Sequence, residues 1–89
     1  MLLHPDEIKK SVEPLGWEYL DRSIVKTFDF HSYRDAVDFA VSVSDIAERL
    51  DHHPRITINY KDVVVKIWSH DLGGVSTKCI NLASSIDRL

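Results

Sequence analysis

The sequence is poor in several features, and each shortage excludes a class of protein. It has one cysteine in 89 residues, so no disulfide forms within the chain, which fits a reducing compartment such as the cytoplasm. The short apolar start is followed by acidic residues, and no long hydrophobic run occurs, so we expect neither a signal peptide nor a membrane span. The net charge of -3 lacks the basic excess of a protein that binds nucleic acid.

What is present is the composition of a small globular domain. Hydrophobic residues make up 44% of the chain and charged residues 28%, both ordinary values. No repeat, low-complexity tract or linker interrupts the chain, so we expect residues 1–89 to form one domain. A chain of this length buries a modest core, which favours oligomerisation as a source of further stability.

Hydrophobic periodicity predicts three helices and four strands. The helices are expected at 4–13, at 31–50 and after Ser76, and the strands at 17–20, 24–30, 55–60 and 63–68. Pro14 and Pro54 end the first two helices. Because the strands form two hairpins, we predict an α+β fold of order α-β-β-α-β-β-α, with a four-stranded antiparallel sheet and the helices on one face.

The two longer helices carry apolar stripes at helical spacing. Ser32 and Ser76 are expected to cap them, with Asp35 completing a weaker capping box in the first. The expected stripe of the first comprises Tyr33, Ala36, Val37, Ala40, Ala47 and Leu50, and that of the second Cys79, Leu82, Ala83 and Ile86.

The register of the second hairpin decides which residues share a face of the sheet. If Lys61 and Asp62 form its two-residue turn, Tyr60 pairs with Val63 on the core face. Four aliphatic residues then lie on the same face as Tyr60, namely Ile56, Ile58, Val65 and Ile67. A one-residue slip would reverse the two faces.

The same register gathers three histidines. It places His53 opposite His70 on the outer face, with His52 beside them at the end of the long helix. Such a cluster can be a polar surface group, an acid–base site or a zinc site. Spacing alone favours these in that order, because adjacent histidines seldom turn both rings toward one ion. His4 and His31 are interpreted as surface residues.

Three further residues have alternative interpretations. Trp68 shares the face of the histidines, where it either packs or forms an aromatic wall for a flat heterocycle. Cys79 is more typical of a small buried hydrophobe than of a thiol activated by the helix start. The Gly73 and Gly74 pair is too weak a signal for a phosphate loop and indicates a turn.

Together these residues resemble the pterin-4a-carbinolamine dehydratase family. The resemblance rests on ERLDHHP, the tyrosine ending the next strand, WSHD, GVS, INLA and, upstream, GW and IVKTFDFHSYRDAVDFA, and it covers residues 15–89. It implies the same α+β fold, assembly as homodimers or homotetramers, and loss of water from a 4a-hydroxy-tetrahydropterin. No metal or organic cofactor is implied, and no nucleic acid or membrane partner is expected.

The resemblance also implies a set of site residues. His52, His53 and His70 are the expected catalytic residues: His52 and His70 transfer protons, and His53 binds and orients the pterin. The expected lining of the substrate pocket is Asp51, His52, His53, Trp68, Ser69, His70 and Asp71.

One position departs from the family pattern. Members usually carry an aspartate three residues after the Ser or Thr that opens the last helix, and here that residue is Cys79. We expect a neutral thiol neither to complete a capping box nor to supply a carboxylate, which predicts weakened activity. The alternative is a dehydratase-like binding or dimerisation module, acting as a transcriptional cofactor or an assembly factor.

Overall fold

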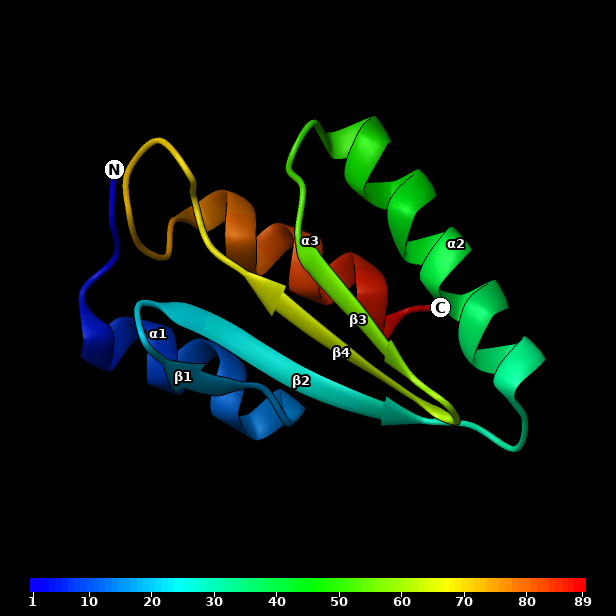
Figure 1. The fold of residues 1–89 in the computed structure, drawn as a ribbon. Helices are drawn as coiled ribbons and strands as arrows, with labels where there is room; N and C mark the ends of the chain where they lie inside the picture. The colour runs from blue at the N-terminus through cyan, green and yellow to red at the C-terminus, as the bar shows by residue number, and fades with distance from the viewer.

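The computed structural model describes residues 1–89 and confirms the expected order of elements (Figure 1). Three helices and four strands alternate as α-β-β-α-β-β-α, with a short 3-10 turn at Glu13–Leu15 after the first helix. The elements are α1 Pro5–Val12, β1 Glu18–Leu20, β2 Ser23–Asp29, α2 Tyr33–Leu50, β3 Arg55–Asn59, β4 Asp62–Ile67 and α3 Thr77–Asp87.

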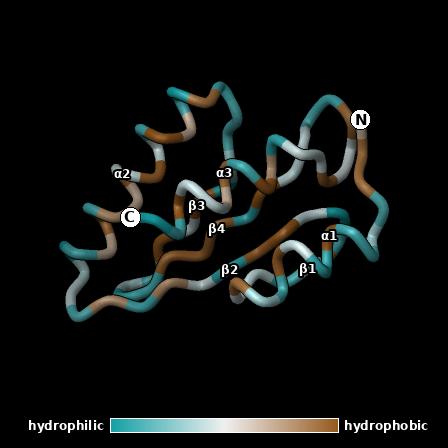
Figure 2. The backbone as a smooth tube through the Cα atoms, turned by 180° about the vertical axis from the view of Figure 1, so that it is seen from behind, coloured by the Kyte–Doolittle hydropathy of each residue, from teal (hydrophilic) through white to brown (hydrophobic).

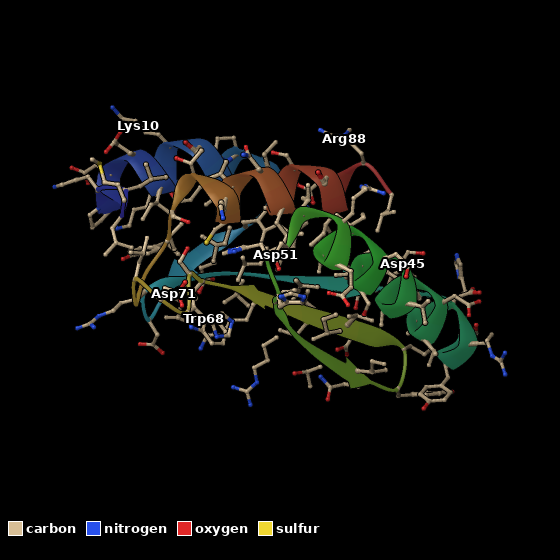
Figure 3. All side chains as sticks on the ribbon, turned by 90° about the horizontal axis from the view of Figure 1, so that it is seen from above. Lys10, Asp45, Asp51, Trp68, Asp71 and Arg88 are labelled. Atoms are coloured by element: carbon tan, nitrogen blue, oxygen red, sulfur yellow. The ribbon has the colours of Figure 1, made fainter.

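The four strands form one antiparallel sheet in the order β1-β2-β4-β3. The two hairpins are therefore joined through their later strands: β2 pairs with β4, with Ile24 opposite Ile67 and Phe28 opposite Val63. The three helices lie on one side of this sheet, and its other side is free of helices (Figure 3). None of the helices combines the length and apolar character needed to cross a bilayer.

The register predicted for the β3–β4 hairpin is wrong by two residues. The closing pair is Asn59 with Asp62, so the turn consists of Tyr60 and Lys61. The amide Nδ2 of Asn59 also donates to Oδ1 of Asp62 at 3.3 Å, which favours closing the ladder there. Because a slip of two residues keeps the alternation of faces, Val63 still faces the helices, but Tyr60 is 69% exposed at a positive φ of 51° rather than in the core.

The core lies between the sheet and the helices. Figure 2 shows the hydrophobic colour along β4 and hydrophilic turns between elements. The expected face of α3 is fully buried. In α2 the prediction is partly wrong: Tyr33 and Leu50, at the helix ends, are exposed, whereas Val43 and Ile46 are buried. The buried α2 residues are Ala36, Ala40, Val43, Ile46 and Ala47, which follow the 3.6-residue repeat more closely than the predicted stripe did.

Helix capping follows the predicted serines and adds a histidine. Ser32 Oγ accepts the amide N–H of Asp35 at 3.0 Å and begins α2, as predicted. His4, interpreted as a plain surface residue, caps α1: its Nδ1 accepts the amide N–H of Asp6 at 3.3 Å, and its own N–H donates to Glu7 Oε1 at 3.1 Å. Histidine is not a usual capping residue, so this role gives no clear sequence signal.

One charged network is mostly buried on the helix side of the sheet. Nζ of Lys26, on β2, donates to the carbonyl of Leu15 at 2.7 Å and to Oδ1 of Asp87 at 2.9 Å. Oδ2 of Asp87 accepts the indole N–H of Trp17 at 2.9 Å. We call Trp17, Lys26, Asp87 and the Leu15 carbonyl the Lys26 network; it ties β2 to the end of α3.

Candidate active site

The end of α2 turns the two adjacent histidines in different directions. Asp51 takes the left-handed conformation, with φ 50° and ψ 46°, and thereby ends the helix. The amide N–H of His52 still bonds the carbonyl of Ala47 at 3.0 Å. As a result His52 is buried, with 8% of its surface exposed, while the side chain of His53 is 55% exposed.

The loop from β4 to α3 forms the opposite wall of the site. Ser69 and Gly74 form an isolated bridge, with the Ser69 N–H bonding the Gly74 carbonyl at 2.7 Å. Gly73 lies at a φ of 68°, where a side chain would strain the backbone. This tight turn, rather than a phosphate loop, holds His70 against the segment that follows α2, and Asp71 joins the lining of the pocket.

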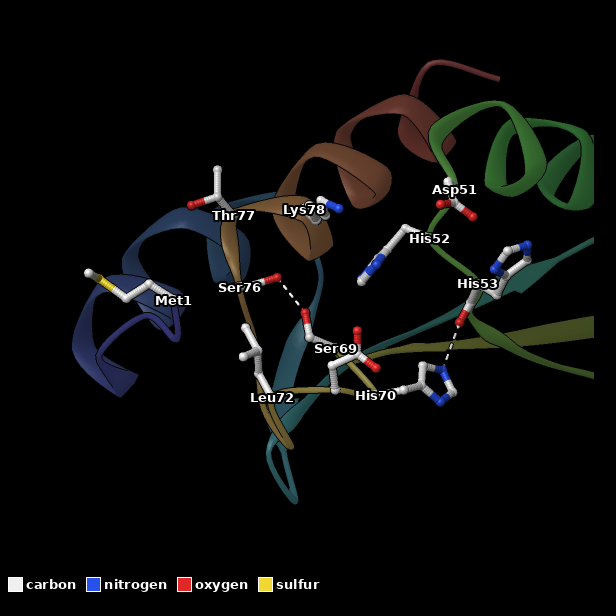
Figure 4. Close-up of a pocket in the computed structure, with 11 residues that line it drawn as sticks. Met1, Asp51, His52, His53, Ser69, His70, Leu72, Ser76, Thr77 and Lys78 are labelled. Atoms are coloured by element: carbon white, nitrogen blue, oxygen red, sulfur yellow. Dashed lines mark hydrogen bonds between the residues drawn. The ribbon is translucent and has the colours of Figure 1, made fainter.

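A pocket of about 720 Å³ lies between these two segments (Figure 4). The structure brings six of the expected residues to its lining: Asp51, His52, His53, Ser69, His70 and Asp71. Five more lining residues were missed: Met1, Leu72, Ser76, Thr77 and Lys78. The start of α3 supplies three of these, and the preference of Ser for the N-cap was the one sequence signal that pointed there.

His52 lies buried in the wall of the pocket, where its neutral form is favoured. Burial is the main reason that its pKa is lowered, and the positive charge of Lys78 lowers it further. Its Nε2 lies 3.2 Å from Sγ of Cys79. No buried side-chain nitrogen or oxygen lacks a hydrogen-bond partner. Since Nδ1 of His52 makes no hydrogen bond, it must be in contact with the open volume of the pocket.

His70 meets the end of α2 through the backbone of His53. Its Nε2 lies 3.1 Å from the His53 carbonyl oxygen. A carbonyl can only accept, so Nε2 of His70 carries a hydrogen and Nδ1 of the neutral ring is an acceptor. The two residues are adjacent as expected, but the shifted hairpin register replaces the predicted cross-strand pair by this ring-to-backbone contact.

His53 and Trp68 lie at the edges of the site. Nε2 of His53 lies 2.6 Å from Oε2 of Glu48, an unpredicted partner in the last turn of α2. Trp68 does not line the pocket, contrary to expectation, because side chains alternate along a strand and Ile67 takes the helix side. Trp68 instead stacks on the ring of His70, with ring centroids 4.6 Å apart.

Cys79 lies directly behind His52 and is completely buried. Its Sγ accepts the amide N–H of Ser76 at 3.5 Å. The expectation that a thiol cannot take the side-chain part of a capping box is therefore wrong, because sulfur can accept over this longer distance. The hydroxyls of Ser69 and Ser76 bond each other beside the sulfur. We call His52, Ser69, Ser76 and Cys79 the Cys79 network.

The three imidazoles share a pocket but have separate partners. His52 is hydrogen-bonded to a thiol, His53 to a carboxylate and His70 to a backbone carbonyl. No group of three or more His, Cys, Asp or Glu side chains is arranged to hold a metal ion. The arrangement instead offers ring nitrogens of different character, which is what a site that both gives and takes protons requires.

Curated relatives resemble the chain along nearly its whole length. Residues 1–89 match the family model described as pterin 4 alpha carbinolamine dehydratase. A protein of Natronomonas pharaonis, named as a candidate pterin-4-alpha-carbinolamine dehydratase, is 40% identical over 87 residues, which cover 98% of this chain and 94% of that protein. A protein of Sulfolobus acidocaldarius with the same name is 34% identical over 90 residues, covering 100% and 99%.

Two solved structures share the fold. One is a transcriptional coactivator/pterin dehydratase from Brucella melitensis, with a TM-score of 0.91, 27% identity, and coverage of 99% of this chain and 97% of that chain. The other is a pterin dehydratase-like protein described as a RuBisCO assembly factor in the alpha-carboxysome. Its TM-score is 0.66 at 19% identity, with coverage of 81% and 83%, and this likeness concerns the fold alone.

Proposed function

Because the chain belongs to the pterin 4 alpha carbinolamine dehydratase family, we propose that it removes water from a 4a-hydroxy-tetrahydropterin and releases a quinonoid dihydropterin. The C4a–O bond and the N5–H bond break, and a C4a–N5 double bond forms. The leaving oxygen gains one proton and N5 loses one, so the reaction is redox neutral. The proposal therefore calls for proton transfer and no cofactor.

The observation that carries the proposal is the pairing of His52 and His70 across one pocket. His52 presents Nδ1 to the pocket from a buried position, where its neutral form is favoured. His70 keeps its hydrogen on Nε2 and leaves Nδ1 as an acceptor. In the proposed roles His52 serves the leaving hydroxyl, and His70 takes the proton of N5.

The remaining polar residues suit the binding of a pterin ring. A volume of about 720 Å³ lies within the usual range for small-molecule sites. The carboxylates of Asp51 and Asp71 can accept hydrogen bonds from the N–H groups of the pyrimidine half. His53, turned outward to Glu48, is proposed to bind and orient the substrate at the pocket mouth.

A stopped-flow assay on chemically generated 4a-hydroxy-tetrahydropterin tests the proposal. The protein is expected to accelerate dehydration well above the uncatalysed rate, and His52→Ala and His70→Ala to lose most of that acceleration. His31→Ala is the matched control, because His31 is exposed and does not line the pocket. A wild-type rate equal to the uncatalysed rate would dispose of the proposal.

A second candidate is a binding or dimerisation module with weak or no activity. It is favoured by the Brucella melitensis structure, described as a transcriptional coactivator as well as a pterin dehydratase, and by Cys79 at the position of the family aspartate. The same assay separates the two, because a module without activity leaves the dehydration rate unchanged while still being able to bind a reduced pterin.

The assembly and location of the chain are also part of the proposal. We propose a homodimer or homotetramer, as the family resemblance implies, located in the cytoplasm, where the free thiol of Cys79 would be kept reduced. Light scattering of the purified protein measures the assembly directly, and a monomer at micromolar concentration would contradict it.

A further inference from the structure

The Cys79 network places several hydrogen-bond donors and acceptors around one buried sulfur atom. All four of its members are more than nine-tenths buried: 8% of His52, 7% of Ser69, 6% of Ser76 and none of Cys79 is exposed. Polar groups this deeply buried are paired with one another. The positions of the hydrogens can therefore be deduced by counting donors and acceptors.

The sulfur of Cys79 is already supplied with donors. The amide N–H of Ser76 points to it at 3.5 Å. Of the two serine hydroxyls, one donates to the other. The second hydroxyl hydrogen can reach the sulfur, at 3.6 Å from Ser69 Oγ or 3.7 Å from Ser76 Oγ. Together with the amide N–H, it can fill both lone pairs of a thiol sulfur.

The hydrogen of the thiol itself then has one place to go. A charged thiolate without solvent contact is disfavoured, so Cys79 carries its S–H, and the neighbour left without a hydrogen bond from the network is Nε2 of His52, 3.2 Å away. If Nε2 instead carried a hydrogen, three donors would point at the sulfur, and the S–H would have to turn to a serine oxygen at the longer distance of 3.6 or 3.7 Å. The shorter contact of 3.2 Å favours Nε2 of His52 as the acceptor of the S–H.

We propose that Cys79 is a positioning residue, which holds the neutral ring of His52 in the tautomer with its hydrogen on Nδ1. The pocket then meets an N–H donor and not a lone pair. A carboxylate at position 79 would act in the opposite sense, because it can only accept. It would place a hydrogen on Nε2 and, by its charge, favour the imidazolium, which is the stronger acid.

This inference deepens the proposed function. Only its consequence for catalysis rests on that function. An Nδ1–H of His52 can donate a hydrogen bond to the leaving hydroxyl, but the neutral ring is a weaker proton donor than an imidazolium. Compared with the aspartate that the family resemblance implies at this position, Cys79 thus keeps the hydrogen bond from His52 to the substrate but makes His52 a weaker acid. The tautomer itself is a property of the free protein and is measured without substrate.

Long-range ¹H–¹⁵N NMR of protein labelled with ¹⁵N-histidine at pH 8 reads the tautomer of each ring. His52 is assigned by the signal that disappears in His52→Gln. Two other rings serve as internal references of the opposite tautomer: His4 accepts a hydrogen bond at Nδ1, and His70 donates from Nε2. The expected result is that His52 alone among these three carries its hydrogen on Nδ1.

Variants at Cys79 make the test independent of a merely structural role. Cys79→Ser keeps one hydrogen and two lone pairs and is expected to preserve the Nδ1–H signal. Cys79→Asp is expected to move the hydrogen to Nε2 or to protonate both nitrogens. Should Cys79→Asp fail to fold, Cys79→Ala, which removes the donor to Nε2, is expected to lose the Nδ1–H preference.

Two results would overturn the inference: a wild-type His52 with its hydrogen on Nε2, or a tautomer that is the same in all folded variants. Neither depends on dehydratase activity. A chain that shows the Nδ1–H tautomer but no dehydration refutes the proposed function alone, whereas active enzyme with Nε2–H refutes the role of Cys79 alone.

Discussion

The Lys26 network and the Cys79 network both remove polar atoms from solvent, but they are closed in different ways. In the first, an ammonium and a carboxylate neutralise each other, and the remaining hydrogen bonds go to Trp17 and a backbone carbonyl. In the second, no formal charge is present, and one atom, Nδ1 of His52, remains open to a pocket. The first arrangement stabilises the fold, and the second retains a reactive nitrogen.

The difference predicts that substitutions in the Lys26 network lower the stability of the fold, whereas substitutions in the Cys79 network change the activity. A group whose partners are all within the protein contributes to the free energy of unfolding. A group that keeps an unused hydrogen-bonding position toward the pocket can act on a substrate, and the core then loses one internal hydrogen bond. Four changes, from the largest expected effect to the smallest, break or sharpen this comparison.

The largest effect is expected from His52→Gln. Loss of a positioned proton-transfer group lowers the dehydration rate by about 10²- to 10⁴-fold, whereas the amide can still fill most of the space of the ring. Stopped-flow kinetics measures the rate, and circular dichroism checks the fold. His31→Gln is the control; a rate in His52→Gln within twofold of the control would contradict the assignment.

Asp87→Ala is expected to lower the stability of the fold and leave the activity unchanged. It leaves the indole N–H of Trp17 without an acceptor and Lys26 with only the carbonyl of Leu15, which costs about 1–3 kcal/mol of the free energy of unfolding. Urea denaturation measures this loss, and the dehydration rate per folded molecule is expected to be unchanged. Asp45→Ala, at an exposed carboxylate on α2, should have little effect, and equal losses in both variants would count against a structural role for the network.

Cys79→Asp converts the neutral network into a charged one beside the pocket. A carboxylate behind His52 favours its imidazolium, and we expect the dehydration rate to rise about tenfold, which corresponds to about 1.4 kcal/mol of transition-state free energy. Cys79→Ser, which supplies the same donor pattern without a charge, is expected to leave the rate unchanged. No change in Cys79→Asp would show that residue 79 does not limit the reaction.

The smallest effect concerns stability against pH. The pKa of His52 is lowered by burial and by the positive charges of Lys78, His70 and His53, with Asp51 opposing them. Between this lowered pKa and the ordinary value of about 6.5, the unfolded chain binds more protons than the folded chain. The free energy of unfolding is therefore unaffected by His52 above about pH 6.5 and falls as the pH drops through that window.

Thermal or urea unfolding at a series of pH values from 8 to 5 measures this dependence. In His52→Gln the part of the acid-induced loss that belongs to this ring is expected to disappear, so the variant loses less stability than the wild type over the same interval. Identical slopes in the two proteins would mean that the burial of His52 does not couple its protonation to folding.

Much of the fold could be predicted from local patterns. The element order, the serine caps of α2 and α3, and the buried face of α3 follow from periodicity and capping chemistry, which act over a few residues. The register of the β3–β4 hairpin was missed by two residues because Lys61 and Asp62 are a weak turn signal. This error did not change which face of the sheet the strand residues were assigned to, because the alternation of side chains repeats every two residues.

The site was less accessible to sequence reasoning. The hairpin register grouped the three histidines, and family resemblance added Asp51 and the segment Ser69–Asp71. Lys78 and Glu48 were not assigned to the site, because nothing local links them to a histidine. Trp68 was assigned to the pocket because the register put it on the face of the histidines and the family resemblance included its segment. It does lie beside the ring of His70, but it does not line the pocket. Sequence adjacency was a poor guide wherever a loop or strand changed the direction of the side chain.

The sequence by itself determined the kinds of chemistry available: three imidazoles near two element ends, one thiol at the start of α3, and alternating apolar residues that bury one face of the sheet. These depend on composition and short-range spacing. Only the tertiary structure decided that His52 contacts Cys79 while His53 turns away, and that His70 bonds a backbone carbonyl. The physical reason is that a ring's protonation depends on its burial and on partners distant in the chain, and these are fixed only when helices and sheet pack together.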